Sequence, residues 1–333
     1  MEVLNVGIIG CGNFATNTNQ YLMANPLYNI YASCDIVEEA AKKIAEKTNA
    51  AYHTTDVDKI FTDKNIDVVF ITTRHDSHAP LSVKAANAKK HVFCEKPMAL
   101  SREECRLIVK AVKDNNVKYC VGYNRGWAPM ITKARCLLAA QKKPKMIYYR
   151  IQDPFGTSHW THIPEVGGGR FVGEGCHIFD LLCALIDSPP VSVYAAGGTF
   201  TNPTIVKIPD SAIVTITFLD GSVCTAMINS DGCSGIPKEG AEIYCDGKGM
   251  LMDNFKKLEL FGYDGQKKQE WILDTIDKGM EIEFDLFAKS IINDTQPPNG
   301  IINAARAAVI SYMVNESIFS GKPIVISEKD YIF

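Results

Sequence analysis

The pattern of apolar and polar residues changes about a third of the way along the chain. Up to residue 122, short apolar runs such as "VLNVGII", "NIYASC" and "DVVFITT" alternate with segments that carry one apolar helical face. We expect helices over 38–48, 77–88 and 101–115. Strands that alternate with helices of this length are typical of an α/β domain with a parallel, doubly wound sheet.

The remaining residues, 123–333, show a different pattern. Apolar or alternating runs flank Asp220-Gly221 and again Asp246-Gly247, and an Asp-Gly pair in this setting predicts a β-hairpin. Further strand-like runs are "KMIYYRI", "VSVYAAGG" and "KLELFG", and a helix is expected from about Ile302 to Ser320. This part of the chain is therefore predicted to be rich in antiparallel sheet.

Composition narrows the class of protein. The 333 residues favour two domains at ~150 residues per domain, and a net charge of −3 gives no electrostatic case for binding nucleic acid or an anionic membrane. The apolar runs fall short of the ~20 residues of a membrane span. Because the N-terminal residues enter a strand directly, we expect no secretory or transit peptide. The 11 cysteines include no C-x-x-C pair. We expect reduced thiols and a cytoplasmic location.

The first strand runs directly into a glycine-rich turn, "GCGNFA", residues 10–15. In a strand–turn–helix context this pattern lets backbone N–H groups and a helix N-terminus approach a pyrophosphate. Asp35 ends the next strand at a spacing near that of an acid that binds an adenosine ribose, and Ile36 and Val37 follow it. Because no Arg or Lys directly follows Asp35, the 2′-phosphate of NADP would meet a carboxylate without a compensating cation. NAD is therefore expected rather than NADP. The residues of the turn expected to bind the cofactor are Gly10, Gly12, Asn13 and Phe14.

Polar side chains also follow the later strands of this first domain. In a doubly wound sheet, ligands bind at the carboxyl ends of the strands. The candidates for cofactor binding are Thr72, Thr73, His78, Glu95 and Lys96, and those for substrate binding are Asn124 and Arg125.

A second set of ionisable residues interrupts an otherwise apolar helix expected over 171–186. Glu174, His177 and Asp180 are spaced three apart and so lie on one stripe of that helix. Buried charges cost several kcal/mol unless they are paired or face a cavity. The stripe is therefore either a satisfied core network or part of a functional site.

These motifs, taken in order, resemble those of the Gfo/Idh/MocA family, the relatives of glucose–fructose oxidoreductase and inositol dehydrogenase. The likeness covers nearly the whole chain through "GCGNFA", "ITTRHDSHAPLSVKAA", "HVFCEKPMA", "GYNRGWAP" and "GGGRFVGEGCHIFDLL". The resemblance implies an NAD-binding Rossmann domain over 1–122 and an α+β domain for substrate binding and oligomerisation over 123–333. The large, mostly antiparallel sheet of the second domain usually mediates dimerisation, so a homodimer or homotetramer is expected.

The resemblance also implies catalytic roles. Hydride transfer from an alcohol needs a group that moves the hydroxyl proton and a cation that stabilises developing negative charge. Lys96 matches the catalytic lysine of the family's E-K-P motif, and His177 matches the histidine that exchanges the proton, whose ordinary pKa is ~6.5. Asp180 matches a position that can contact substrate hydroxyls. One departure is Gly173, which replaces the family's aspartate; Glu174, one residue later, is expected to orient the imidazole instead.

Two assignments remain open within the expected second domain. Trp160 and Arg170 are either substrate-binding residues, since aromatic faces pack on sugar rings, or ordinary packing residues. His159 and His162, together with His177 and Glu174, are residue types that bind zinc, so a zinc site is the alternative to consider. We expect no metal, because hydride transfer requires no activated water.

The function expected from the resemblance is an NAD(P)-dependent dehydrogenase that acts on a CH–OH group of a sugar, sugar derivative or cyclitol. One alternative is an NAD-dependent glycosidase that works through transient oxidation, and another is a non-catalytic dinucleotide-sensing regulator. The presence of both Lys96 and His177 argues against the regulator, which needs neither. The expected partner is a small polyhydroxylated molecule.

Overall fold

The computed structural model describes residues 3–12 and 20–333, so Asn13 and Phe14 lie outside the described residues. Contacts divide the chain into two compact units. The first comprises Met1–Tyr123, Met280–Ala305 and Phe333, and the second comprises Asn124–Gly279 and Arg306–Ile332. The sequence predicted a single boundary, with domains over 1–122 and 123–333. In the structure, Met280–Ala305 and Phe333 instead return to the first unit.

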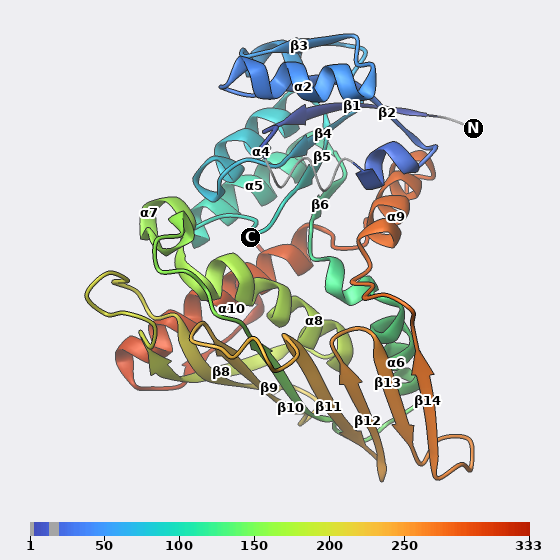
Figure 1. Cartoon of the computed structure of the whole chain (residues 1–333), viewed down its shortest axis with the longest axis vertical. Coiled ribbons are helices and arrows are strands. Elements are labelled where there is room, and N and C mark those ends of the chain that lie inside the picture. Colours follow the sequence, from blue (N-terminus) through green and yellow to red (C-terminus); the bar gives the residue numbers. More distant parts are fainter. Residues whose placement is uncertain (1–2, 13–19) are drawn as a thin grey trace. The chain divides into compact units, whose positions relative to one another are not determined.

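The first unit contains a six-stranded sheet in the order β3-β2-β1-β4-β5-β6, and every strand pair is parallel (Figure 1). The strands are β1 Leu4–Ile9, β2 Tyr28–Cys34, β3 Tyr52–Thr54, β4 Val68–Ile71, β5 His91–Cys94 and β6 Tyr119–Val121. The chain changes direction across the sheet between β1 and β4, which places a topological switch point at their carboxyl ends. The predicted doubly wound sheet is confirmed.

The three helices expected in the first unit form close to the expected residues, as α2 Glu38–Thr48, α4 His78–Asn87 and α5 Arg102–Asn115. Two further helices, α3 Val57–Thr62 and α9 Met280–Ile292, were not expected, and the 3₁₀ turn η1 His75–Ser77 precedes α4. At the start of α5, the Ser101 hydroxyl accepts a hydrogen bond from the backbone N–H of Glu104, as a good N-cap does. Its C-cap, Asn116, takes the left-handed conformation that ends the helix.

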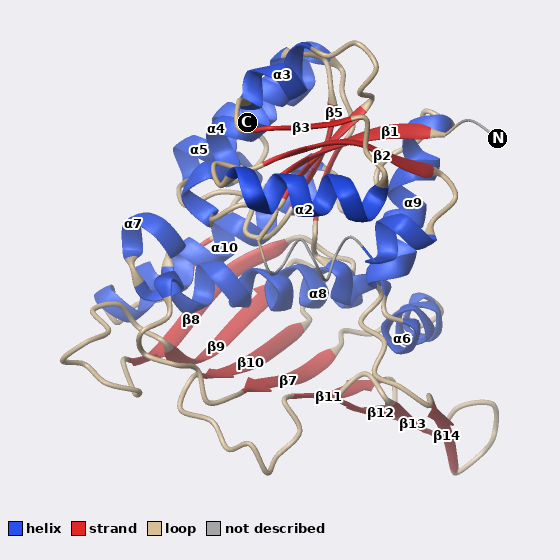
Figure 2. Ribbon diagram, turned by 45° about the horizontal axis from the view of Figure 1, so that its top comes forward, coloured by secondary structure: helices blue, strands red, loops and turns tan. Residues whose placement is uncertain are grey.

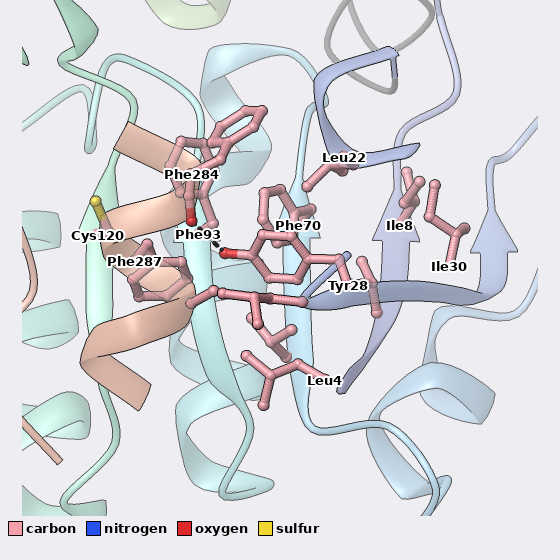
Figure 3. Close-up of a cluster of buried hydrophobic side chains, with 14 of the residues drawn as sticks. Leu4, Ile8, Leu22, Tyr28, Ile30, Phe70, Phe93, Cys120, Phe284 and Phe287 are labelled. Carbon is pink, nitrogen blue, oxygen red and sulfur yellow. Dashed lines mark hydrogen bonds between the residues drawn. The ribbon is translucent and has the colours of Figure 1, made fainter. Parts of the chain in front are cut away.

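Helix α9 belongs to the first unit because its apolar face completes the core over the sheet (Figure 3). The rings of Phe284 and Phe93 have centroids 4.9 Å apart, and those of Phe284 and Phe70 are 5.5 Å apart. The Tyr28 hydroxyl donates to the carbonyl of Phe284 at 2.8 Å. Burial of each large apolar side chain stabilises the fold by about 1.5–3 kcal/mol. A segment far along the chain is thereby fixed to the nucleotide-binding sheet.

The second unit is built on a nine-stranded sheet in the order β14-β13-β12-β11-β7-β10-β9-β8-β15. The strands are β7 Met146–Gln152, β8 Pro190–Gly198, β9 Ser211–Phe218, β10 Val223–Asn229, β11 Glu239–Cys245, β12 Lys248–Asp253, β13 Lys257–Phe261, β14 Lys268–Ile272 and β15 Ile324–Val325. Only β7 and β10 pair in parallel, so the predicted, mostly antiparallel sheet is confirmed. Both expected Asp-Gly hairpins form, β9–β10 and β11–β12. At the second, Asp246 and Gly247 both have positive φ, as a two-residue hairpin turn requires.

Helices cover one face of this sheet, and no described helix covers the other (Figure 2). The helices of the unit are α6 Pro129–Ala139, α7 Pro164–Gly167, α8 Cys176–Ile186 and most of α10 Ile301–Ser320, with the 3₁₀ turns η2 Asn124–Trp127 and η3 Trp160–His162. Along the strands, buried and exposed residues alternate. The uncovered face therefore presents large side chains to solvent: Met146, Tyr148, Tyr194, Ile213 and Tyr244. In the described part of the chain, no helix has the length and apolar character to cross a membrane.

Candidate active site

The glycine turn of the first unit is held tightly against the end of β4. Gly10 has φ +93°, and a Cβ there would lie 2.8 Å from the carbonyl carbon of Thr72. The Thr72 hydroxyl donates to the Gly10 carbonyl at 2.5 Å, and its N–H donates to Ile9 at 2.8 Å. At Gly12, by contrast, an added Cβ would meet no described atom within 4 Å. The turn is thus closed toward the sheet, and the described atoms leave space beside Gly12, which fits a dinucleotide pyrophosphate.

Asp35 lies beside this turn, at the end of β2. Its Oδ2 accepts a hydrogen bond from the N–H of Cys11 at 2.6 Å, and its Oδ1 accepts one from the N–H of Val37 at 2.8 Å. A carboxylate offers about four acceptor sites, so two backbone bonds leave capacity for ribose hydroxyls. Ile36 is 94% exposed and contributes no positive charge. The residues present therefore fit an adenosine ribose with a free diol.

Glu95 and Lys96 follow β5, which is the neighbour of β4 in the sheet. The Glu95 side chain is buried, and burial raises its pKa to about 7 although the charge of Lys96 opposes the shift. Gly122 gives this carboxyl its space, because a Cβ there would lie 3.0 Å from Glu95 Oε2. The peptide bond between Lys96 and Pro97 is cis. Because the carboxyl ends of parallel strands lie at one edge of a sheet, Lys96 lies at the same edge as the glycine turn.

His78, which the sequence suggested as a cofactor-binding residue, is the first residue of α4 and is completely buried. Its Nδ1 lies 2.7 Å from the carbonyl oxygen of Pro97, and its Nε2 lies 3.2 Å from that of Thr73. The ring therefore joins the loop after β4 to the loop after β5.

In the second unit, the helix expected over 171–186 forms in two parts. A π-helical turn covers Phe171–Gly175, and α8 follows it at Cys176. Turns of this kind are frequent at functional sites. His177 and Asp180 lie three residues apart on α8, so they share a face of the helix, and each is 5% exposed.

Asp180 is a buried carboxyl with two arginines near it. Burial raises its pKa to about 7, while the positive charges of Arg306 and Arg135 lower it. Its Oδ2 also lies 3.7 Å from the position that a Cβ of Gly126 would take. Asp180 is therefore a carboxyl that changes protonation near neutral pH in the folded protein.

Glu174 belongs to a buried network of charges. Arg125 donates to Glu174 through Nη2 at 2.8 Å and to both oxygens of Glu239 at 2.8 and 3.1 Å. Lys278 and the hydroxyl of Tyr149 also donate to Glu239, at 2.5 and 2.6 Å. Burial alone would raise the pKa of Glu239, but Arg125 and Lys278 outweigh it and lower the pKa to about 2. The network fixes Arg125, an expected substrate-binding residue, against two carboxylates.

The other expected substrate residues of this unit have partners of their own. The guanidinium of Arg170 pairs with Asp153 and lies over the Phe155 ring, 4.5 Å from its centroid. The amide of Asn124 donates to the carbonyl of Lys278 at 2.9 Å, and Trp160 begins the turn η3. Over residues 3–12 and 20–333, no three His, Cys, Asp or Glu side chains gather closely enough to hold a metal ion.

Several residues of these networks were not singled out from the sequence. They are Arg135, Tyr149, Glu239, Lys278 and Arg306. Glu239 could have been identified from the sequence. Side chains two residues apart on a strand point to the same face, so Glu239 is predicted to point inward with Ala241 and Ile243 of β11. Its partner Lys278 could not have been found in this way, because it comes from a distant part of the chain, and the pairing of Arg125 with Glu239 was likewise not expected.

The burial of Asp180 predicts a pH dependence of stability. The folded protein retains this proton up to about pH 7, whereas the unfolded chain releases it near 3.8. Between these values the folded state binds more protons, so the contribution of Asp180 to the free energy of unfolding falls as pH rises. We expect Asp180→Asn to flatten the decline of the melting temperature between about pH 4 and pH 7.

Asp187→Asn is the matched control, because Asp187 is exposed and caps the same helix in the left-handed conformation that asparagine also adopts. Thermal unfolding of both variants across this pH range is the measurement. An identical pH profile for wild type and Asp180→Asn would contradict the shifted proton.

Models of known protein families match a segment in each of the two units. The family model of the oxidoreductase family with an NAD-binding Rossmann fold matches residues 4–123, and that of the GFO/IDH/MocA C-terminal domain matches residues 137–251. The oxidoreductase YrbE of Bacillus subtilis is 26% identical, over 98% of this chain and 97% of that protein. Myo-inositol 2-dehydrogenase of Thermotoga maritima is 22% identical, over 98% of this chain and 99% of that protein.

A solved structure shows the same fold. Levoglucosan dehydrogenase in complex with NADH and levoglucosan has a TM-score of 0.87 at 21% identity, over 98% of this chain and all of that chain. The predicted family, fold, oxidoreductase class and nicotinamide dinucleotide cofactor are confirmed. The chain belongs to the Gfo/Idh/MocA family of NAD-binding oxidoreductases.

Proposed function

We propose that the protein is an NAD-dependent dehydrogenase that oxidises a secondary hydroxyl of a sugar, sugar derivative or cyclitol. The observation that carries this proposal is the position of Lys96, directly after β5 and at the same edge of the sheet as the glycine turn and Asp35. A cation in that position can stabilise negative charge beside a bound dinucleotide. Relatives named as inositol 2-dehydrogenases and levoglucosan dehydrogenase support the substrate class.

Each proposed catalytic residue has a separate task. The bound nicotinamide would accept the hydride. Lys96 stabilises the negative charge that develops on the substrate oxygen as its proton leaves. His177 takes that proton, and Asp180 on the same face of α8 contacts a neighbouring hydroxyl. Glu174, fixed by Arg125, sets the position of the turn that precedes His177.

An assay separates this proposal from its alternatives. A panel of cyclitols, aldoses, anhydrosugars and glycosides is incubated with NAD, and NADH absorbance is followed together with release of aglycone. A dehydrogenase accumulates NADH in proportion to the substrate consumed. Aglycone release without net NADH indicates the glycosidase. NAD binding without turnover of any compound favours the dinucleotide-sensing regulator.

Asp35 is expected to make the protein prefer NAD over NADP. Its carboxylate is held in place by two backbone N–H groups, accepts the ribose diol and repels a 2′-phosphate. We expect the dissociation constant of NADPH to exceed that of NADH by ~10²-fold or more, and Asp35→Asn to narrow the ratio. Fluorescence titration with both reduced cofactors gives the constants. Equal affinities in the wild type would contradict this role.

Lys96→Ala and His177→Ala are expected to lose chemistry while they retain the cofactor. Removing a matched transition-state charge or a general base lowers turnover by ~10²–10⁴-fold, whereas the glycine turn and Asp35 still bind NADH. Turnover is measured on the substrate that the panel identifies, with NADH affinity and melting temperature determined in parallel. Lys118→Ala, on the loop before β6, is the control and should leave turnover unchanged. Turnover within threefold of wild type would remove the substituted residue from the mechanism.

The uncovered face of the nine-stranded sheet is proposed as the surface through which the chain forms a homodimer or homotetramer. Its exposed Tyr and Ile side chains would be buried there, as in stable subunit interfaces. We expect sedimentation at a multiple of the 36.7 kDa chain mass, and a shift toward monomer for the double variant Tyr148→Glu, Ile213→Glu. The same pair of charges at Leu107 and Lys110, on exposed positions of α5, is the control. A wild-type monomer would refute the interface.

A further inference from the structure

We propose that His78 is a positioning residue that holds the loop bearing Lys96 in register with the nucleotide-binding turn. The imidazole is completely buried and lies between two backbone carbonyl oxygens, Pro97 O at 2.7 Å from Nδ1 and Thr73 O at 3.2 Å from Nε2. Pro97 directly follows Lys96. The side chain therefore acts on the catalytic lysine through the backbone next to it. This inference rests on the proposed function of Lys96.

A continuous series of contacts leads from the glycine turn to this loop. The Thr72 hydroxyl donates to the carbonyl of Gly10, and its N–H donates to the carbonyl of Ile9 at the end of β1. A Cβ at Gly10 would collide with Thr72, so the two segments are in close contact. The next residue, Thr73, presents its carbonyl to His78, and its hydroxyl accepts a hydrogen bond from Ser77 at 2.6 Å. Because the opposite edge of the ring meets Pro97, the imidazole transmits the position of the turn to the loop after β5.

A neutral His78 ring can donate a hydrogen bond to only one of its two carbonyl partners. Carbonyl oxygens only accept hydrogen bonds, and a neutral imidazole has a single N–H to donate. Burial lowers the pKa of His78, hydrogen bonding to the carbonyl oxygens of Pro97 and Thr73 raises it, and the charge of Lys96 lowers it. The proton of the neutral ring belongs on Nδ1, because a lone pair there would face the Pro97 oxygen at only 2.7 Å. The bond to Pro97 is thus the one that carries the positioning.

This asymmetry gives a matched pair of substitutions. An asparagine amide can place its nitrogen near the position of Nδ1, so His78→Asn can keep the bond to Pro97. A glutamine amide reaches the position of Nε2, so His78→Gln can keep only the contact with Thr73. His78→Leu keeps neither. His91→Leu is the control, because His91 lies at the opposite end of β5 and its Nδ1 accepts the N–H of Lys118.

The first experiment measures turnover and NADH affinity for these variants. We expect His78→Leu and His78→Gln to lower kcat by ~10²-fold, as a small misplacement of a catalytic group does, with little change in the KM for NAD. His78→Asn should stay within ~10-fold of wild type and His91→Leu within ~3-fold. If His78→Leu fails to fold, the comparison of Asn with Gln decides: equal rates for these two would overturn the proposal.

A double variant tests whether His78 acts through Lys96. In the Lys96→Ala background, His78→Leu should cost no further turnover, because the group it positions is gone. An equal loss in both backgrounds would overturn the proposal, as would a His78→Leu enzyme with wild-type kcat per NADH-binding site. Full turnover of Lys96→Ala alone would instead refute the proposed role of Lys96, so the two failures are distinguishable.

Chemical labelling adds a readout that needs no turnover. Reductive methylation of Lys96 by formaldehyde and cyanoborohydride is followed by peptide mass spectrometry, with and without NADH. We expect NADH to protect Lys96 in wild type and in His78→Asn, and the protection to fall by ~5-fold or more in His78→Leu. Unchanged protection in His78→Leu would overturn the proposal, and this measurement decides where the turnover of Lys96→Ala is too low to quantify.

Discussion

The close backbone contact between β1 and β4 at their carboxyl ends is the constraint on which the nucleotide-binding unit depends. A glycine at position 10 is required there because any side chain would collide with the Thr72 carbonyl group. The same approach lets the Thr72 hydroxyl donate to the Gly10 carbonyl at 2.5 Å, so this backbone acceptor has a side-chain partner. Asp35 fixes the other side of the turn through the N–H of Cys11. Three separate strands thereby hold one turn, which is what a preorganised pyrophosphate site needs.

The second unit depends on a different device, a carboxylate buried among cations. Glu239 is fully buried, and its charge is tolerated because Arg125, Lys278 and Tyr149 all donate to it. Removing one partner of such a buried pair typically costs about 3–5 kcal/mol, because the other charge stays uncompensated. Arg125 also holds Glu174, so the charge at the start of β11 determines where the turn before α8 lies. The π-helical geometry of that turn and the burial of the network are therefore parts of one arrangement.

Sequence patterns predicted those features that depend on neighbours close in the chain. The spacing from Gly10 to Asp35, the Asp246-Gly247 turn and the boundaries of α2 all follow from local geometry, and the structure places them as expected. Contacts between residues far apart in the sequence could not be predicted from such local patterns. Tyr28 meets the backbone of Phe284 across 256 positions, and Arg125 meets Glu239 across 114. Each partner is an ordinary residue in its own segment, so only the three-dimensional fold reveals the return of α9 and the charge network.

Two buried carboxyls of the second unit, Glu239 and Asp180, differ in their pKa values and therefore in what they can do. Glu239 and Asp180 are both shielded from water, yet the pKa of the first falls to about 2 and that of the second rises to about 7. Burial raises both, and the difference lies in their partners: direct hydrogen bonds from cations fix Glu239 as an anion, whereas the charges of Arg306 and Arg135 only moderate the shift at Asp180. The oxygens of Glu239 accept from Arg125, Lys278 and Tyr149, so this carboxylate serves to hold its cationic partners in place. A carboxyl poised near neutrality, on the helical face that carries His177, can exchange a proton or a hydrogen bond with a hydroxylated ligand, and that property favours Asp180 as the chemical group of the pair.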